Sequence, residues 1–204
     1  KVALLKFIHY LVVLFYRQAI IMIDNKLQNA IKKIKLLVSD VDGVLTDRKI
    51  LISADGIESK FFNVEDGTAA ALARYSDIPI ALISGRYSKC TEIRAKELKI
   101  EHCFQKTLNK KSILDKLTKI YSVEYDQIAY IGDSLVDLPI LEIVGFSVSV
   151  PDGHVKVKNS VSYITSKLGG EGVLLEVIEM ILEYQGRYDD ILKAMKEKEF
   201  EKSP

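Results

Sequence analysis

The chain has 204 residues, of which 48% are hydrophobic, and its 29 Lys and Arg nearly balance its 28 Asp and Glu, for a net charge of +1. This length predicts one domain with short appendages, and the absence of a basic block argues against nucleic-acid binding. The two cysteines, Cys90 and Cys103, form no CxxC pair and sit in no histidine cluster, so neither a zinc site nor a disulfide framework is expected. Two scattered thiols suit a reducing compartment, and we expect a cytoplasmic protein.

Residues 1–23 form a hydrophobic N-terminal extension that is interrupted by Lys6, His9 and Arg17. The stretch between Lys6 and Arg17 is ten residues long, whereas a bilayer span needs about 20 mostly apolar residues. No small-residue cleavage site is evident, so neither a membrane anchor nor a signal peptide is expected. The alternatives are an extension upstream of Met22 that contributes little to the fold, or an amphipathic helix that docks on a partner.

Short apolar runs alternate with helical patterns along the rest of the chain. The runs that predict strands are 34–39, 80–83, 103–104, 127–131, 146–150 and 163–164. The patterns that predict helices are 24–33, one beginning near 66, one ending at 98, 109–121, 134–143, 171–185 and 188–200. Buried strands that alternate with helices predict a doubly wound α/β fold, in which a parallel sheet is covered on both sides.

A β-hairpin is expected after the first strand. The strand-like runs 49–53 and 57–64 flank Ala54-Asp55-Gly56, and an Asp-Gly pair between two such runs is a strong hairpin signal. The main domain is predicted to cover 24–187, followed by a C-terminal helical tail at 188–204.

Polar residues gather where the predicted strands end. Asp40 and Asp42 follow the first strand, Ser84 follows the next buried strand, and Asp133 follows a third. Lys110 lies at the start of the helix after the brief strand at 103–104. Because ligands bind at the carboxyl ends of the strands in open α/β sheets, we expect these groups to meet in one crevice.

The acidic residues predict a magnesium site. In an extended strand end, Asp40 and Asp42 point the same way, and a cation relieves the repulsion between two such carboxylates. Oxygen ligands select a hard ion such as Mg²⁺. Asp133 is the natural further ligand, and Asp137, one helical turn on, is placed to hold a coordinated water.

The same residues predict phosphoryl transfer. The Asp40 carboxylate can attack phosphorus to form an aspartyl-phosphate, and a metal ion lets the two anions approach. Asp42 can donate a proton to the leaving alcohol and later accept one from water. The Ser84 hydroxyl and the Lys110 ammonium would hold the phosphoryl oxygens.

Each residue also has a purely structural interpretation, because Asp-x-Asp-Gly is common in turns and in calcium loops. Single residues could act as turn formers, helix caps or solvated charges: Asp42-Gly43, Ser84, Asp66, Asp133, and either Lys110 or its neighbour Lys111. What favours catalysis is the joint occurrence of four polar groups at four strand ends, in this order.

The four groups resemble the motifs of the haloacid-dehalogenase superfamily. Its first motif, a hydrophobic run followed by DxDGxxTD, matches LLVSDVDGVLTD at 36–47, and its second, a strand followed by Ser or Thr, matches ISGR at 83–86. Its third motif, a lysine, is best matched by Lys110, and its fourth, GDxxxD, matches GDSLVD at 132–137. The resemblance implies a magnesium-dependent phosphatase with an aspartyl-phosphate on Asp40.

The chain from 34 to 186 is similar to the capless 3-deoxy-ulosonate phosphate phosphatases, which act on sugar-acid phosphates such as 3-deoxy-D-manno-octulosonate 8-phosphate. The similar stretches are FNVEDG at 62–67, ISGRYSK at 83–89, RAKELKI at 94–100, IAYIGD at 128–133, LPILEIVGFSVSV at 138–150 and GGEG at 169–172. The resemblance implies no cap domain and a homotetramer whose neighbouring subunits close each active site. It also implies substrate-binding roles for Asn63, Asp66, Gly85, Arg86 and Glu171.

Four positions depart from the pattern of the octulosonate branch. Glu65 replaces an arginine in FNVRDG, Glu171 replaces one in GGRG, Ser134 replaces the second aspartate of GDD, and Lys106 replaces a glycine. None of them is a core catalytic group. An arginine favours an anionic substrate group, whereas a glutamate repels it. GGEG resembles the branch that acts on nonulosonate 9-phosphates, so the choice between eight and nine carbons stays open.

Two readings of other classes compete with the enzyme. Receiver domains also form an aspartyl-phosphate on a doubly wound sheet, but they place the acidic pair and the phosphorylated aspartate on different strands. Alternatively, phosphatase-like domains fused to acylneuraminate cytidylyltransferases can serve assembly. The complete set of Asp40, Asp42, Ser84, Lys110 and Asp133 favours an active enzyme.

Overall fold

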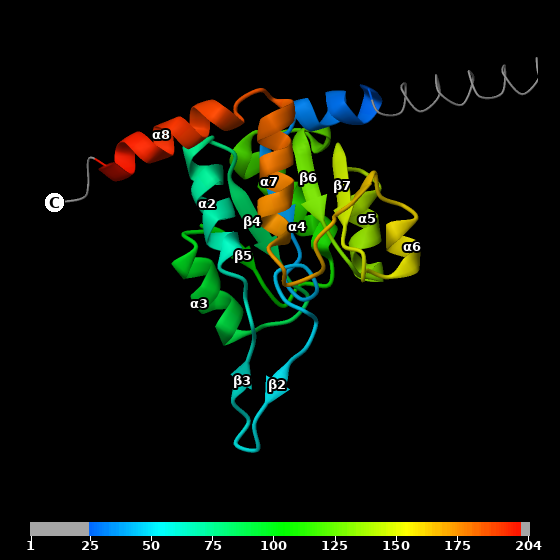
Figure 1. Ribbon diagram of the computed structural model, residues 1–204. Coiled ribbons are helices and arrows are strands. Elements are labelled where there is room, and N and C mark those ends of the chain that lie inside the picture. The colour runs from blue at the N-terminus through cyan, green and yellow to red at the C-terminus, as the bar shows by residue number, and fades with distance from the viewer. Residues whose placement is uncertain (1–24, 201–204) are drawn as a thin grey trace, which may run out of the picture.

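The structure is a computed structural model that describes residues 25–200. The predicted N-terminal extension over 1–23 lies outside the described residues. A parallel sheet of six strands forms the centre, in the order β5-β4-β1-β6-β7-β8 (Figure 1). The strands are β1 Leu36–Ser39, β4 Ile80–Ile83, β5 His102–Phe104, β6 Ile128–Ile131, β7 Phe146–Ser149 and β8 Tyr163–Ile164. The predicted doubly wound α/β fold is confirmed.

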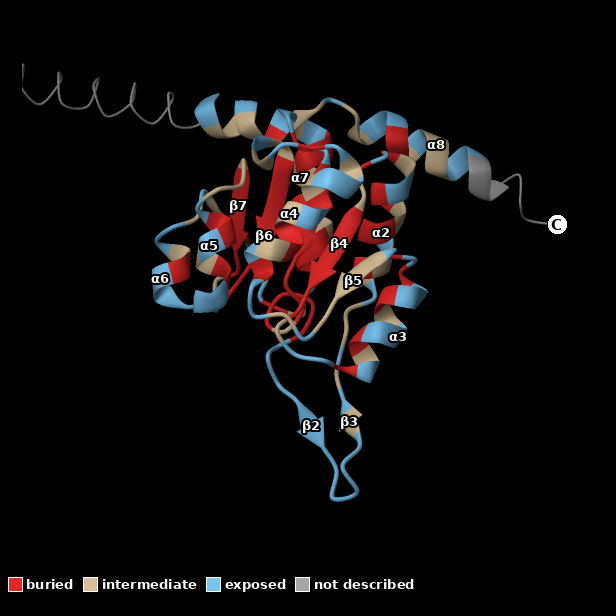
Figure 2. Ribbon diagram, turned by 180° about the vertical axis from the view of Figure 1, so that it is seen from behind, coloured by how far each residue is buried: buried red, intermediate tan, exposed pale blue. Residues whose placement is uncertain are grey.

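Helices cover both faces of the sheet, which makes three layers. One face is covered by the helix over 25–32, α2 Glu65–Tyr75, α3 Lys89–Glu97, α7 Val173–Tyr184 and α8 Tyr188–Phe200. The other face is covered by α4 Lys110–Tyr121, α5 Leu138–Leu141 and α6 Val155–Lys158. Every residue of β1, β4, β6 and β7 is buried (Figure 2). A strand buried on both faces is mostly apolar, which explains the apolar runs of the sequence, although β7 also buries Ser147 and Ser149.

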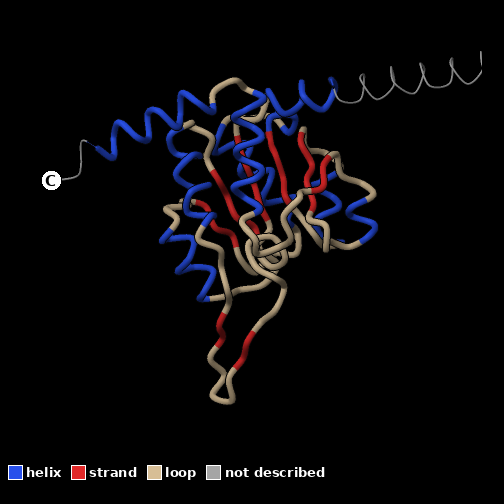
Figure 3. The backbone as a smooth tube through the Cα atoms, viewed as in Figure 1, coloured by secondary structure: helices blue, strands red, loops and turns tan. Residues whose placement is uncertain are grey.

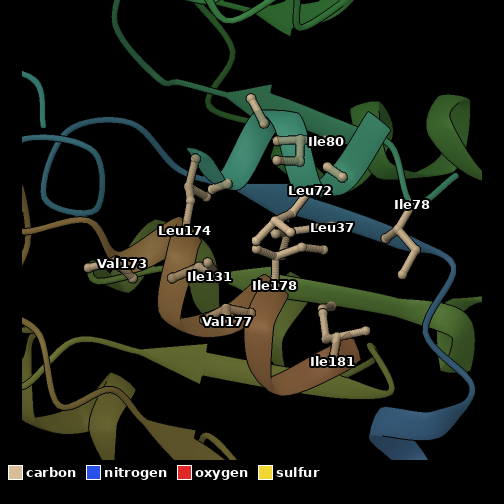
Figure 4. Packing of buried hydrophobic residues seen from close by; sticks show 14 of the residues in the cluster. Leu37, Leu72, Ile78, Ile80, Ile131, Val173, Leu174, Val177, Ile178 and Ile181 are labelled. Atoms are coloured by element: carbon tan, nitrogen blue, oxygen red, sulfur yellow. The ribbon is translucent and has the colours of Figure 1, made fainter. Parts of the chain in front are cut away.

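The core between β1, α2 and α7 holds the sheet against its helical layer. Leu37 and Ile131 of the sheet pack with Leu72 of α2 and Ile178 of α7 (Figure 4). Ile191 of α8 belongs to the same cluster. The C-terminal helix therefore docks on the domain, while the boundary predicted at residue 187 stays a prediction.

The predicted hairpin is confirmed, with shorter strands than the apolar runs. Strands β2 Leu51–Ile52 and β3 Glu58–Ser59 pair antiparallel, and Gly56 takes φ +82 in the connecting turn. The hairpin projects beyond the carboxyl ends of the sheet strands (Figures 1 and 3). It makes up the insertion between β1 and α2, in agreement with the predicted lack of a cap domain.

The prediction of one continuous helix over 134–143 is wrong, because this segment is divided into two short helical pieces. A short 3₁₀ turn at Leu135–Asp137 is followed by α5 at Leu138–Leu141, and another 3₁₀ turn at Tyr125–Gln127 precedes β6. Proline lacks a backbone N–H, so Pro139 is tolerated only in the first turn of a helix. Among the described residues, the helices are too short or too polar for any of them to cross a bilayer.

Candidate active site

The sheet brings the predicted catalytic residues to one edge. Asp40 directly follows β1, and its backbone N–H donates to the Ile131 carbonyl at 2.9 Å, which extends the pairing of β1 with β6. Ser84 directly follows β4, and Asp133 comes two residues after β6. Lys110 is the first residue of α4. These chain segments meet between the sheet and the hairpin (Figure 3).

Lys110 is a buried cation between two carboxylates. Its Nζ lies 2.8 Å from Asp40 Oδ1 and 2.7 Å from Asp137 Oδ1, and its side chain is 2% exposed. Tyr130 OH also donates to Asp137 Oδ1, at 2.6 Å. Lys111, the alternative left open by the sequence, is exposed and pairs with Asp115. The residue beside Asp40 is therefore Lys110.

Asp137 and Asp133 are held by different partners. Asp137 Oδ2 accepts from the Asp133 N–H at 3.2 Å, and from Ser134 N–H and Oγ at 3.0 and 2.9 Å. Asp133 Oδ2 accepts from Arg48 Nε at 2.6 Å, whereas its Oδ1 is buried and has no hydrogen-bond partner. Gly43 leaves room for this carboxylate, because a Cβ there would lie 2.2 Å from Asp133 Oδ2 and Gly43 takes φ +113.

The three buried carboxylates form a site that a divalent cation fits. Asp40, Asp133 and Asp137 each bring one carboxylate oxygen within 4.8 Å of the others. Burial raises the pKa of Asp40 to about 7, opposed by Lys110 and reinforced by Asp137 and Asp133. A donor set made of oxygens alone, with one buried Asp133 oxygen unpartnered, suits a hard ion such as Mg²⁺.

Burial by itself would lower the pKa of Lys110, but the carboxylates of Asp40 and Asp137 more than offset this, and the pKa is raised. Lys110 therefore stays an ammonium, able to stabilise negative charge next to Asp40.

Asp42 lies apart from this cluster. Its Oδ1 is 2.5 Å from Lys60 Nζ, at the end of the hairpin, and Asp42 is not among the three clustered carboxylates. The expectation that Asp40 and Asp42 point the same way assumed an extended backbone. Instead the chain turns at once, and Leu45 N–H donates to the Val41 carbonyl at 3.0 Å. Asp42 therefore lies apart from the other three predicted metal ligands, Asp40, Asp133 and Asp137.

Ser84 and the two residues after it form a tight turn at the end of β4. Ser84 is 2% exposed, and its Oγ donates to the Arg86 carbonyl at 2.9 Å and accepts from the Arg86 N–H at 3.2 Å. Gly85 packs in the same turn, near Leu108. Arg86 Nη2 lies 2.6 Å from Glu58 Oε2, so the predicted substrate-binding arginine is paired with the hairpin.

The other predicted substrate-binding residues lie on the loops before α2 and α7 and in the first turn of α2. Asn63 Nδ2 donates to the Gly170 carbonyl at 3.2 Å, which joins the two loops. Glu171 is exposed, whereas Asp66 is 1% exposed and both its carboxylate oxygens are buried without a hydrogen-bond partner. Contact of these residues with a substrate stays a prediction.

Three residues of the site were not predicted from the sequence: Arg48, Lys60 and Tyr130. Arg48 contacts Asp133, 85 residues away, and Lys60 contacts Asp42, 18 residues away, so neither has a local signal. Tyr130 did carry one. It is the single hydroxyl-bearing side chain in an otherwise apolar strand, and a buried tyrosine hydroxyl usually has a hydrogen-bond partner.

Replacing Asp66 by Asn is expected to stabilise the protein most above about pH 7, with the gain shrinking toward about pH 4. Burial raises the pKa of Asp66 from 3.8 to about 7, opposed mainly by Arg94. Over that range the folded protein holds a proton that the unfolded chain has lost, so stability falls as pH rises. The amide does not titrate. Melting temperatures of Asp66→Asn and of the exposed control Asp190→Asn across pH test this, and a gain independent of pH would contradict it.

The described residues place an aspartate cluster and a buried lysine at the carboxyl edge of a doubly wound sheet, which is the arrangement expected of a phosphoryl-transfer site. A family model described as haloacid dehalogenase-like hydrolase matches residues 9–177, and the chain belongs to this family. It is a phosphatase of the haloacid-dehalogenase superfamily.

The chain is similar to characterised and structurally known members of this family. It is 40% identical over 159 residues to the 3-deoxy-D-manno-octulosonate 8-phosphate phosphatase KdsC of Escherichia coli, covering 78% of this chain and 85% of that protein. The same enzyme from Moraxella catarrhalis, in complex with magnesium, phosphate and KDO, matches with a TM-score of 0.80 and 40% identity over 84% of this chain and 98% of the other. A subfamily III A hydrolase of the superfamily from Legionella pneumophila matches with a TM-score of 0.85 and 32% identity over 88% and 99%.

Proposed function

We propose that this chain hydrolyses 3-deoxy-D-manno-octulosonate 8-phosphate with Asp40 as the nucleophile. The observation that carries the proposal is the buried cluster of Asp40, Lys110, Asp133 and Asp137 in a chain 40% identical to enzymes with this activity. The same activity is attributed to relatives over most of the length of both chains.

In the first half-reaction the Asp40 carboxylate attacks phosphorus, and the bond from phosphorus to the sugar oxygen breaks. Asp42 gives a proton to that oxygen, so the sugar leaves as an alcohol. In the second half-reaction Asp42 takes a proton from water, which attacks the aspartyl-phosphate and frees inorganic phosphate and Asp40. Lys110, at 2.8 Å from Asp40, stabilises the negative charge in both steps, and Ser84 holds a phosphoryl oxygen.

Mg²⁺ is the proposed cofactor, held by Asp40, Asp133 and Asp137. When bound, it supplies positive charge that lets the anionic phosphate approach a carboxylate. The unpartnered Oδ1 of Asp133 supports this assignment, and so does the relative that carries magnesium in its crystal structure. The sequence predicted Asp42 both as a metal ligand and as the acid and base, and it is proposed in the second role alone because it lies apart from the three clustered carboxylates.

The contacts of the residues predicted to surround the substrate favour a sugar acid with eight carbons. The sequence alone left the choice between eight and nine carbons open. Glu65, which replaces an arginine of the octulosonate branch, forms an ion pair with Lys167, so its charge is neutralised within the chain. The exposed Glu171 keeps the nonulosonate 9-phosphate alternative relevant. Arg86 can bind the carboxylate of the substrate when its ion pair with Glu58 is broken.

The enzyme is proposed to be cytoplasmic and to form a homotetramer with shared active sites. The hairpin supports this assembly, because it projects from the domain and exposes Leu51, Ile52, Ile57 and Phe61 by 60–77% of their surface. Exposed apolar side chains of this density commonly mark a protein interface. A monomeric mass in solution would contradict the tetramer.

The proposed activity is tested by phosphate release from 3-deoxy-D-manno-octulosonate 8-phosphate, with Mg²⁺ and after chelation. Release that stops on chelation and returns with Mg²⁺ is expected, because three crowded carboxylates otherwise repel the substrate phosphate. The matched comparison is a nonulosonate 9-phosphate under the same conditions. Faster turnover of the nine-carbon compound would keep the mechanism and change the substrate, and no release from either would contradict the proposal.

A further inference from the structure

Lys60, at the end of the hairpin, places its side chain beside Asp42 at the carboxyl edge of the sheet. Lys60 follows β3, and its side chain is 0% exposed although the hairpin itself is largely solvent-exposed (Figure 2). A buried ammonium is costly unless it is paired and hydrogen-bonded. The residues that contact the Lys60 ammonium therefore indicate what role it has at this position.

Those partners are three oxygen-bearing side chains from three different segments. Lys60 Nζ lies 2.5 Å from Asp42 Oδ1, in the turn after β1, and 3.4 Å from Thr91 Oγ1 of α3. Glu58 Oε1 of β3 is 3.7 Å away. The hydrogen bonds to Asp42 and Thr91 join the hairpin to the turn after β1 and to α3, which restricts the position of Asp42.

The ion pair continues as a row of alternating charges. Asp42 pairs with Lys60, Lys60 faces Glu58, and Glu58 pairs with Arg86 at 2.6 Å. Hydrogen bonds from Arg86 and Ser88 help to lower the pKa of Glu58 to about 2, so Glu58 is charged. The row connects Asp42 to the arginine proposed to bind the sugar acid.

We propose that Lys60 is a positioning residue that holds Asp42 away from the carboxylate cluster and toward the leaving group. This inference rests on the acid role proposed above for Asp42. The backbone turn that begins at Val41 carries Asp42 away from the carboxylate cluster, and the pairing with Lys60 fixes its side chain on the side of the hairpin. The pair uses Asp42 Oδ1, which leaves Oδ2 for the substrate oxygen.

A comparison of two phosphate esters isolates this role. An alkyl phosphate such as 3-deoxy-D-manno-octulosonate 8-phosphate needs a proton on its leaving oxygen, whereas p-nitrophenolate leaves without one. Lys60→Met is expected to lower kcat/KM on the alkyl ester by about 10²-fold, the usual size of a general-acid contribution, and kcat/KM on p-nitrophenyl phosphate by no more than about 3-fold. The ratio kcat/KM is compared because it covers only the steps up to departure of the leaving group, before Asp42 acts as the base in the step that both esters share. Because both rates come from one preparation, their ratio does not depend on the fraction of folded enzyme.

Two further variants complete the test. Asp42→Asn is expected to show the same ester dependence, and adding Lys60→Met to it is expected to cause no further loss on the alkyl ester, because both changes remove one function. Lys49→Met is the matched control, since Lys49 also pairs with an aspartate near the hairpin but is 85% exposed, and its ester ratio is expected to be that of the wild type. If Lys60→Met does not fold, Lys60→Ala replaces it, because it also removes the donor that faces Asp42.

An equal loss on both esters, or no loss on either, would overturn the positioning role of Lys60. If the wild type does not hydrolyse the octulosonate phosphate, the substrate proposal fails, and the ester comparison is made with glycerol 3-phosphate as the alkyl ester. A wild type that hydrolyses none of these esters would overturn the phosphatase mechanism on which the inference rests.

Discussion

Asp40→Asn is expected to abolish phosphate release, lowering kcat by at least about 10⁴-fold, as the loss of a catalytic nucleophile does elsewhere. The amide is nearly the same size as the carboxylate, so it fits the buried position after β1, but it cannot form an acyl phosphate. Phosphate release with saturating substrate and Mg²⁺ measures the effect.

The control for this variant is Asp47→Asn, a partly exposed aspartate in the same motif that pairs with Lys49. It is expected to keep activity close to that of the wild type. Residual activity of Asp40→Asn within about tenfold of the wild type would mean that another group attacks phosphorus.

Lys110→Met is expected to lower the free energy of unfolding by about 3–5 kcal/mol, because it leaves two buried carboxylates without their shared cation. The methionine side chain has a similar length, so the loss reports charge more than packing. Activity is also expected to fall steeply, since the ammonium 2.8 Å from Asp40 Oδ1 stabilises the phosphoryl group in transfer. Urea unfolding in the presence of a chelator measures the stability.

Lys111→Met is the matched control for Lys110→Met. Lys111 is the next residue along α4, 47% exposed, and it pairs with Asp115 across one helical turn. Such a surface pair contributes little, and the free energy of unfolding is expected to change by no more than about 0.5 kcal/mol. Similar changes in the two variants would contradict the buried ion pair as the source of the effect.

Each acidic residue of the site is held in one orientation by a cation. These cations are Lys60, Lys110 and Arg48. Lys110 holds Asp40 and Asp137, Arg48 holds one oxygen of Asp133, and Lys60 holds Asp42. The acidic residues are thereby sorted, before any substrate binds, into a group that can share a metal ion and one that faces the hairpin. Fixed geometry of this kind is what electrostatic catalysis requires.

The fold and the meeting of Asp40, Ser84, Lys110 and Asp133 at one edge of the sheet could be predicted from the sequence. Strands buried on both faces need mostly apolar residues, and apolar runs were visible at β1, β4 and β6, while β7 alternates apolar residues with buried serines. The carboxyl ends of parallel strands share one edge, so the residues after them had to meet. Asp-Gly likewise placed the hairpin, because its turn needs a residue that tolerates positive φ.

The tertiary structure alone decided which charges pair. The sequence favoured Lys110 over Lys111 only through its resemblance to a family motif, because the direction of a side chain depends on how α4 meets the sheet. The sequence also predicted that Asp42 points the same way as Asp40. The pattern of apolar residues does not reveal the turn that begins at Val41. Lys60 and Arg48 reach their partners through the path of the hairpin and its flanking loops. Local sequence specifies backbone periodicity and burial, whereas contacts between loops depend on the packing of the whole domain.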